Sequence, residues 1–311
     1  MKPIYEPKGK AKEYGDYALN IYTGCPHRCF YCFAPNVLHK SREEFHTNVE
    51  PRTDIVKATK QQLKKEKITG KLIHLCFTCD PYPTGYDTTP TREIIKAIKE
   101  SGNNVQILTK GDGRRDFDLL DKNDWYGITL DGTESGIKWR ARVRALAEAH
   151  DRGIKTWVSF EPVTDEKFFY FMLLMVESIA DKVKIGKLNY HKSDINWAEF
   201  GRKAEKLCER LGIDYYIKES LRAEMERKDM SRYVNIEPYD DCKIALHKED
   251  EGIQCRDLPT ADAAEITHGR WIYADGDVGY SVYRCSKCGE VVVLDEERTY
   301  NYCPNCGAKM N

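Results

Sequence analysis

The stretch Gly24-Cys25-Pro26-His27-Arg28-Cys29-Phe30-Tyr31-Cys32 carries three cysteines at the spacing C-x3-C-x2-C. It follows an apolar segment, Tyr17 to Tyr22, that predicts a strand. We therefore expect the cysteines on the loop that leaves this strand. A loop can bring three thiolates around one metal centre, whereas a straight strand or a regular helix cannot.

The number of ligands narrows the kind of centre. A structural zinc site closes with four ligands, and a four-iron cluster usually takes one thiolate for each iron. Three cysteines would leave one iron open to bind a small molecule. Two alternatives stay open: a group of cysteines that holds no metal, and a zinc site completed by His27.

Length and charge limit the class of protein. The 311 residues suit one large domain plus an appendage, and the net charge of -1 gives no overall positive field for nucleic acid. The first ten residues contain no apolar leader, and the longest apolar run, Phe168 to Val176, is too short for the ~18 residues of a membrane span. No membrane partner is expected. Seven of the 12 cysteines fall in two metal-type groups, which favours a reducing cytoplasm over disulfides.

Helical and strand patterns alternate along most of the chain, usually with a glycine after each helix. The expected helices run over 55–66 after a Thr53-Asp54 cap, from a cap at Thr91 to Gly102, from 137 to Gly153, and over 197–211. The expected strands are 17–22, 72–77, 105–108, 126–130, 156–160, 183–186 and 215–217. This order predicts βαβ units, and hence an α/β fold built as a partial or complete parallel (βα) barrel.

The cysteine spacing, with Tyr31 before the last cysteine, resembles the signature of the radical S-adenosylmethionine (SAM) superfamily. Four further segments, 5–11, 20–25, 78–82 and 108–110, are similar to its spore photoproduct lyase-like branch, and the likeness covers roughly residues 3–220. The resemblance implies a 4Fe-4S cluster whose open iron binds SAM. It also implies electron transfer that cleaves SAM to methionine and a 5'-deoxyadenosyl radical, and an oxygen-poor setting.

The resemblance also implies roles for single residues, most of which follow a predicted strand, where parallel barrels place their sites. Cys25, Cys29 and Cys32 would hold the cluster, with Tyr31 near the adenine. The SAM-binding candidates are Lys110 for the methionine carboxylate, Thr78, Asp80 and Thr129 for its amino group or ribose, and Glu161 for ribose or substrate. The alternatives are a salt bridge at the barrel mouth for Lys110 and Glu161, and a strand-end hydroxyl for Thr129.

The implied function is hydrogen abstraction from a substrate, with a flavodoxin or ferredoxin as electron donor. The branch suggests a nucleic acid or nucleotide, as in DNA lesion repair or base modification. A radical SAM enzyme acting on a protein or peptide, and a non-enzymatic iron-sulfur and zinc regulatory protein, are the alternatives. Lyases of this branch need a thiol that quenches the product radical, and Cys76 and Cys79 lie near the second strand end. Both also fit structural cysteines or an auxiliary metal site.

The C-terminal end has a second cysteine pattern, C-x2-C, fourteen residues, C-x2-C, typical of a zinc ribbon. A module of about 40 residues is too small to fold by burial alone, so we expect structural Zn²⁺ on Cys285, Cys288, Cys303 and Cys306. A rubredoxin-like iron site is the alternative. Such a ribbon would bind nucleic acid or protein, although its acidic residues leave no basic face.

The expected domains are the radical SAM barrel at 1–233, a linker or extension at 234–268, and the zinc ribbon at 269–311. Two further cysteines, Cys242 and Cys255, lie in the linker without a paired motif and receive no role. Cys208 lies beside an apolar helical stripe and is expected in the core.

Overall fold

The structure is a computed structural model that describes residues 2–133, 136–226, 268–269, 271–277, 280–286, 291–294 and 309–310. The chain divides into two compact units, residues 1–228 and 229–311. Most of the predicted linker lies outside the described residues, together with Cys242 and Cys255. The boundaries predicted for the linker therefore stay predictions.

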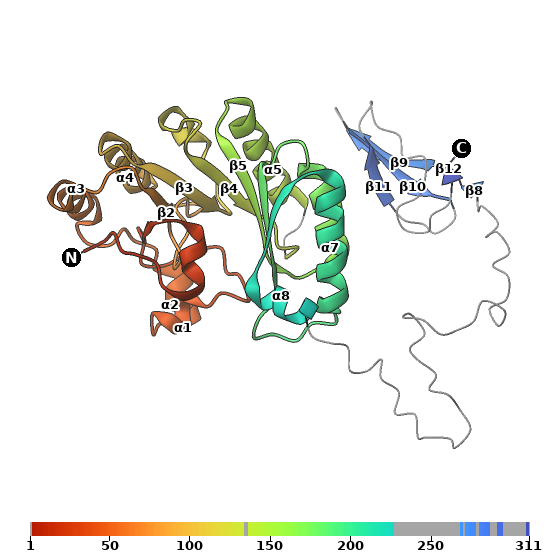
Figure 1. Cartoon of the computed structure of the whole chain (residues 1–311), viewed down its shortest axis with the longest axis horizontal. Helices are drawn as coiled ribbons and strands as arrows, with labels where there is room; N and C mark the ends of the chain where they lie inside the picture. Colours follow the sequence, from red (N-terminus) through yellow and green to blue (C-terminus); the bar gives the residue numbers. More distant parts are fainter. Residues whose placement is uncertain are drawn as a thin grey trace, which may run out of the picture. The chain divides into compact units, whose positions relative to one another are not determined.

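The first unit is built on a seven-stranded parallel sheet in which the strands follow in chain order (Figure 1). Its strands are β1 (Tyr17–Leu19), β2 (Leu72–Leu75), β3 (Asn104–Thr109), β4 (Trp125–Thr129), β5 (Lys155–Val163), β6 (Lys182–Lys187) and β7 (Asp214–Ile217). Each strand pairs in parallel with the next, and β1 and β7 form the two edges. The predicted α/β fold is confirmed, and its barrel is partial.

Helices connect the strands and pack against them, for example α4 on β3, α5 on β4 and β5, and α7 on β7. The bounds are η1 (Gly9–Tyr14), α1 (Ala34–Val37), α2 (Arg42–Thr47), α3 (Ile55–Glu66), α4 (Thr89–Glu100), η2 (Arg114–Leu119), α5 (Gly136–Asp151), α6 (Glu166–Val176), α7 (Trp197–Leu211) and α8 (Glu219–Glu226). In the described part of the chain, no helix has the length and hydrophobicity needed to cross a membrane.

One predicted helix start needs correction, and one predicted cap makes no hydrogen bond. The helix expected to begin at a Thr91 cap begins two residues earlier, and Thr91 is buried inside it, donating a hydrogen bond to Pro81 O at 2.6 Å. The helix at 55–66 has the predicted bounds, but the Asp54 side chain makes no capping hydrogen bond. In both cases the polar residue near the helix start does not make the capping hydrogen bond that its residue type predicts.

The strands alternate between a core face and a face that lines the concave side of the sheet. On β3, Val105 and Ile107 are fully buried in the core, whereas Gln106 and Leu108 line cavities on the concave side. The other strands repeat this pattern, so the core lies between sheet and helices. The concave side is left for polar groups and for ligands.

The short helix η1 fills part of this concave side. Tyr14, its last residue, accepts a hydrogen bond at its carbonyl from Gln106 Nε2 at 2.6 Å, and its ring lies 5.0 Å from that of His74. Lys184 of β6 places Nζ 3.7 Å from the centre of the Tyr14 ring. The segment before β1 therefore contacts strands β2, β3 and β6 and separates two cavities, both lined by Tyr14.

The buried Lys184 predicts a pH dependence of stability. Burial, together with the nearby Lys218 cation, lowers the pKa of Lys184 to about 8, although Glu13 and Glu161 oppose this. Between about pH 8 and 10.5 the unfolded chain then binds more protons than the folded one, so this group adds stability as pH rises. We expect the unfolding free energy of the native chain to rise by about 1–3 kcal/mol relative to Lys184→Met across that range. Urea titrations at each pH would measure it, and parallel curves for the two proteins would contradict it.

The second unit contains an antiparallel sheet in the order β11-β10-β9. Its strands are β9 (Trp271–Asp277), β10 (Tyr280–Cys285) and β11 (Val291–Leu294), and β8 (His268–Gly269) pairs with β12 (Lys309–Met310). Strand β11 lies between the two C-terminal cysteine pairs in the sequence. Cys285 ends β10, but Cys288, Cys303 and Cys306 lie outside the described residues, so the zinc ribbon stays a prediction.

Candidate active site

The cysteine loop leaves the carboxyl end of β1 and is held by α2. Cys25 N donates to Phe45 O at 3.1 Å, and His46 Nδ1 lies 2.8 Å from Cys25 O. Arg42 Nη2 donates to Cys29 O at 2.5 Å. These contacts fix the backbone of the loop without using a cysteine sulfur, so the thiols remain available.

Gly24 sets how closely the loop approaches α2. A Cβ atom at this position would lie 2.3 Å from Phe45 O and 2.7 Å from Asn48 O, both of which are backbone atoms. Any other residue would therefore push the loop away from the helix. This gives a steric reason for the glycine before the first cysteine of the motif.

The thiols of the loop are largely buried. Burial raises the pKa of both Cys25 and Cys32, so these thiols favour the protonated form until a metal replaces the proton. Among the described residues, no three His, Cys, Asp or Glu side chains converge on a point where they could share one metal ion. A four-iron cluster does not require this, because it distributes its thiolates over different irons.

His27 is directed toward Asp80 instead of toward a fourth ligand position. Its Nε2 lies 3.2 Å from Asp80 Oδ2, and both side chains are almost completely buried. The loop therefore fits a multi-iron cluster on three thiolates better than a mononuclear zinc site that includes His27.

Asp80, after β2, ties three strand ends together. Its Oδ1 accepts from Tyr82 N at 2.8 Å and from Thr109 Oγ1 at 2.5 Å, and its Oδ2 accepts from Lys110 N at 2.8 Å. Burial alone would raise the pKa of Asp80, but His27 and these donors hold it below its usual value. Protein donors thus reach both oxygens of Asp80, which holds the backbone of Lys110, and its role as a SAM ligand stays a prediction.

Lys110, after β3, lies beside the cysteine loop. Its Nζ is 2.5 Å from Asp131 Oδ2 and 3.3 Å from Cys29 Sγ, and 5.3 Å from the centre of the Tyr31 ring. The Tyr31 hydroxyl donates to the same carboxylate oxygen. Burial and the Asp131 charge raise the pKa of Tyr31, while Lys110 and Tyr31 hold the pKa of Asp131 below its usual value against burial. Lys110, Tyr31 and Asp131 thus form one buried group next to a cysteine sulfur.

Thr78, two residues before Asp80 in the sequence, has a hydroxyl without a hydrogen-bond partner among the described residues. Its backbone N donates to Asn20 Oδ1 at 2.8 Å, but its Oγ1 is buried without a hydrogen-bond partner among the described residues. A buried hydroxyl without a partner costs free energy, which a ligand atom could recover. Thr129, the other threonine candidate, is buried at the end of β4 opposite Ser159.

Replacing Thr78 tests whether its hydroxyl contacts SAM. We expect Thr78→Val to leave the unfolding free energy unchanged or raise it by about 1 kcal/mol, since the variant removes an unsatisfied group. The same change should weaken SAM binding about five-fold if the hydroxyl contacts the ligand. Thr109→Val is the matched control, because Thr109 Oγ1 already donates to Asp80 and its loss should destabilise the fold. Equal SAM affinity of Thr78→Val and the native chain would contradict the role.

Glu161 lies on another wall of the concave side. Its Oε2 accepts from Tyr14 Oη at 2.8 Å and lies 3.1 Å from Lys218 Nζ. Together with Tyr31 and Cys76 it lines a cavity of about 370 Å³ at the carboxyl ends of the strands. The side chains of Phe33 and Tyr190, 54% and 99% exposed as residues, also line this cavity.

The structure therefore separates the predicted candidates into two groups. Tyr31, Lys110 and Asp80 lie around the cysteine loop. Thr78 lies two residues before Asp80 in the sequence. Glu161 is part of the cavity wall with Lys218, which follows β7. The roles of all these residues in ligand binding stay predictions.

Three residues were missed by sequence reasoning. Asp131 lies two residues after the end of β4, so its place near a strand end was the available signal. Lys218 directly follows β7. Tyr14 precedes β1 and gives no such signal, because only the folded chain brings η1 into the concave side.

The two cysteines after β2 have different surroundings. Cys76 is buried and lines the 370 Å³ cavity, while Cys79 accepts a hydrogen bond from Tyr22 N at 3.4 Å. The strand ends at Leu75, so both lie beyond its regular part. Cys208 is fully buried in the core, as expected.

Comparison with known proteins gives a family and relatives. Residues 19–168 match the model of the radical SAM superfamily. An uncharacterized protein of Methanocaldococcus jannaschii is 27% identical over 206 residues, which are 57% of this chain and 77% of the relative. An uncharacterized protein of Mycobacterium tuberculosis is 33% identical over 113 residues, 33% of this chain and 32% of that protein. The chain thus matches only about a third of the mycobacterial relative.

Two solved structures share the fold at 13% sequence identity. SuiB of Streptococcus suis bound to S-adenosylmethionine has a TM-score of 0.52 and is matched over 70% of this chain and 55% of its own. A mutant of spore photoproduct lyase with bound AdoMet and dinucleoside spore photoproduct has a TM-score of 0.50, over 68% of this chain and 78% of its own. The segment that carries the three-cysteine loop and strands β2 to β5 therefore matches the radical SAM superfamily, and the first unit shares its fold with two structures that bind S-adenosylmethionine or AdoMet.

Proposed function

We propose that this protein is a SAM-cleaving radical enzyme that abstracts a hydrogen atom from a substrate held in the 370 Å³ cavity. The superfamily implies SAM and a 4Fe-4S cluster as cofactors. The observation that carries the proposal is the three-cysteine loop beside the buried group of Lys110, Tyr31 and Asp131, with Lys110 Nζ 3.3 Å from Cys29 Sγ. A structural metal site would not need a buried cation next to its thiolates.

The residues fit these cofactors. Cys25, Cys29 and Cys32 would hold the cluster, because their loop is fixed by backbone contacts that leave the sulfurs unused. When bound, the cluster supplies the electron that cleaves SAM to methionine and a 5'-deoxyadenosyl radical. Lys110 would pair with the methionine carboxylate, and the Thr78 hydroxyl would accept or donate a hydrogen bond to the same ligand.

Asp131 and Asp80 act on the binding site through other residues. Asp131 accepts hydrogen bonds from the Lys110 ammonium group and from the hydroxyl of Tyr31, whose ring would lie along the adenine. Asp80 holds the backbone of Lys110 through the hydrogen bond from Lys110 N. The chain therefore orients one cation from two sides, by its backbone and by its ammonium group.

The cavity suggests the class of substrate. Tyr31, Phe33 and Tyr190 supply aromatic rings around it, and Glu161 and Lys218 supply charged groups that can accept and donate hydrogen bonds. Aromatic side chains of this kind stack on nucleobases. We therefore propose a nucleotide or an unpaired nucleic-acid base as substrate, with Cys76 the thiol that faces it.

The test uses anaerobically reconstituted full-length protein with SAM and dithionite. The proposal predicts 5'-deoxyadenosine and methionine in equal amounts. Adding single-stranded DNA, RNA or nucleotides should raise the rate or transfer deuterium from labelled substrate, while peptide pools should not. Absence of 5'-deoxyadenosine would contradict the enzyme, and deuterium transfer from peptides alone would replace the nucleic-acid substrate with a protein.

The remaining parts of the proposal concern the setting of the enzyme. We propose a cytoplasmic protein that receives its electron from a flavodoxin or ferredoxin, with one structural Zn²⁺ on the four C-terminal cysteines. Metal analysis of the reconstituted chain should then give four irons and one zinc for each protein. Zinc that survives Cys29→Ala and disappears in Cys285→Ser would show that the two sites are independent.

A further inference from the structure

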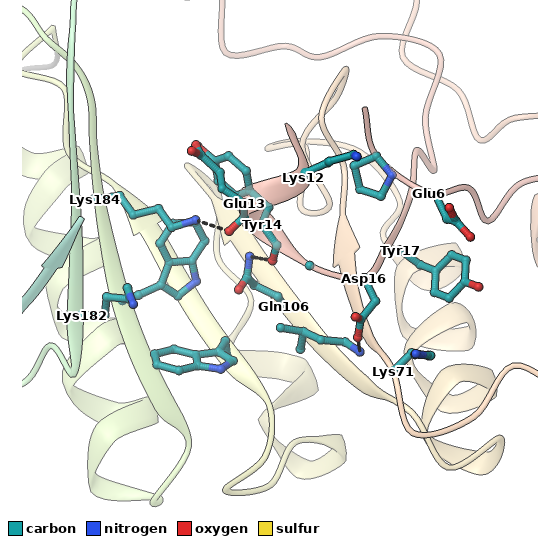
Figure 2. A pocket seen from close by; sticks show the side chains of 15 residues that line it. Glu6, Lys12, Glu13, Tyr14, Asp16, Tyr17, Lys71, Gln106, Lys182 and Lys184 are labelled. Carbon is teal, nitrogen blue, oxygen red and sulfur yellow. Dashed lines mark hydrogen bonds between the residues drawn. The ribbon is translucent and has the colours of Figure 1, made fainter. Parts of the chain in front are cut away.

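We propose a second ligand site, at the amino-terminal ends of the strands, that binds a small organic molecule through an oxyanion group such as a phosphate or carboxylate. The site is a cavity of about 630 Å³, shown in Figure 2. It is independent of the proposed radical chemistry, which lies at the opposite ends of the same strands.

The position of the cavity follows from its lining. Tyr17, Leu72, Trp125 and Lys182 line it, and each is the first residue of its strand. In a parallel sheet these ends lie opposite the cysteine loop, which leaves the carboxyl end of β1. Tyr14 borders both cavities and separates them. A ligand here would therefore contact the far side of the wall that closes the catalytic cavity.

The central observation is Lys184, a buried cation in the cavity wall without a carboxylate partner. The residue is 5% exposed, and its Nζ donates one hydrogen bond, to Glu13 O at 3.2 Å (Figure 2). The nearest aromatic rings are those of Tyr14 at 3.7 Å and Trp157 at 5.2 Å. In the described part of the chain, no carboxylate oxygen lies within 4.0 Å of this ammonium group.

The carboxylates nearest to Lys184 are already paired with another lysine. Lys218 Nζ pairs with Glu13 and with Glu161, so these carboxylates act on Lys184 only from beyond ion-pair distance. A buried cation without a counter-ion is costly, and aromatic rings compensate only part of the cost. The remaining donors of Lys184 thus favour an anion supplied from outside.

The rest of the lining is of mixed charge, with Glu6, Glu13 and Asp16 as carboxylates beside three further lysines. Lys12 and Lys71 line the cavity and take part in no ion pair within the described residues, while Lys182 is paired with Asp214 at 2.9 Å. Asp16 accepts from Leu72 N at 3.0 Å, which occupies one of its oxygens. Three lysines therefore remain for an anion.

The size and apolar lining indicate more than a bare ion. A volume of about 630 Å³ falls in the range of sites for small organic molecules, ~300–1,000 Å³. The rings of Trp125, Trp157 and Tyr17 supply apolar surface beside the lysines. We therefore assign an oxyanion attached to a flat or apolar body.

The test compares three probes that share one ring: phenyl phosphate, benzoate and neutral phenol. Binding to the full-length protein is followed by tryptophan fluorescence, since two tryptophans line the cavity. We expect saturable binding of at least one anion and much weaker binding of phenol. Preference for the phosphate or for the carboxylate would identify the anionic group. Saturation by none of the probes, or equal affinity for phenol, would overturn the proposal.

Substitutions of single lysines test where the anion binds. Lys184→Met should weaken the anion at least ten-fold, whereas Lys155→Met is the matched control. Lys155 is exposed and lies 5.4 Å from the Trp125 ring, but does not line the cavity. The Lys110→Met variant, changed at the other end of the barrel, should also bind the anion normally. This result would show that the anion does not bind at the SAM site. Unchanged affinity in Lys184→Met would overturn the proposal.

A structural measurement covers the case in which Lys184→Met does not fold. Crystals of the native protein soaked with selenate should show an anomalous peak within about 4 Å of Lys184 Nζ, the range of an ion pair. Peaks found only at exposed lysines would overturn the site, whatever the outcome of the SAM-cleavage assay.

Discussion

Cys29→Ala is expected to lower 5'-deoxyadenosine formation by more than about 100-fold, beyond the 10- to 100-fold effects usual for residues that only support a metal ligand. The thiol of Cys29 belongs to the loop after β1, and its sulfur is the one that Lys110 Nζ approaches to 3.3 Å. Loss of this thiolate removes one of only three cysteines available to the cluster. The measurement is the yield of 5'-deoxyadenosine from anaerobically reconstituted protein, together with its iron content.

The matched control is Cys208→Ala. Cys208 is a fully buried core residue on α7, so its loss should cost stability but leave SAM cleavage intact. Zinc content should stay the same in both variants. A Cys29→Ala protein that retains native iron content and native SAM cleavage would show that the cluster is held elsewhere.

The second large effect concerns the buried pair of Lys110 and Asp131, whose side chains are 6% and 1% exposed. Asp131→Leu leaves the ammonium group buried without its carboxylate, and we expect a loss of about 3–5 kcal/mol in unfolding free energy. Adding Lys110→Met to this variant should recover most of the loss, because replacing both charges by apolar groups removes the uncompensated one.

SAM binding separates the structural role of the pair from its functional role. We expect Lys110→Met to weaken SAM binding about 10- to 100-fold, as for loss of a charged hydrogen bond. The double variant should recover stability without recovering this affinity. Lys99→Met is the control, since Lys99 makes a comparable 2.6 Å pair with the buried Asp124 but lies on α4, away from the loop. Normal SAM affinity in Lys110→Met would reduce the pair to a structural salt bridge.

Much of the fold could be predicted because local patterns and tertiary structure agree. Helices 55–66 and 197–211 have the predicted bounds, since their apolar stripes and the residues that follow them act within a few residues of each helix. All seven strands were found, but β1 and β2 end at Leu19 and Leu75, before the predicted ends at 22 and 77, and several others extend beyond the prediction, as β5 does to Val163. Those extra residues pair because a neighbouring strand is present, which local sequence does not show.

The structure also contains helices that periodicity could not identify. The run Phe168 to Val176 is apolar on most sides, so it has no stripe, yet it forms α6 against β5. Helices α1 and α2 are only four and six residues long, and their stability depends on packing beside the cysteine loop.

The site was predictable where a residue follows a strand directly, and not where its partner is distant in sequence. Lys110 could be selected from its strand end, but its contact with Asp131 joins the ends of β3 and β4, and the Tyr31 contact spans 100 positions. Asp80 could be selected in the same way, but its carboxylate accepts a hydrogen bond from the backbone of Lys110, which residue type does not show. Residue type and position indicate where polar groups gather. Only the folded chain shows which of them already form hydrogen bonds or ion pairs with other protein groups.

The most direct measurement is electron–nuclear double resonance on the reduced, reconstituted protein with SAM that carries ¹⁵N in its amino group. An iron held without a protein ligand should bind that nitrogen, and the spectrum should show coupling between the cluster and ¹⁵N. Absence of coupling in protein with a full iron content and saturating SAM would contradict the open iron position on which the proposed function rests.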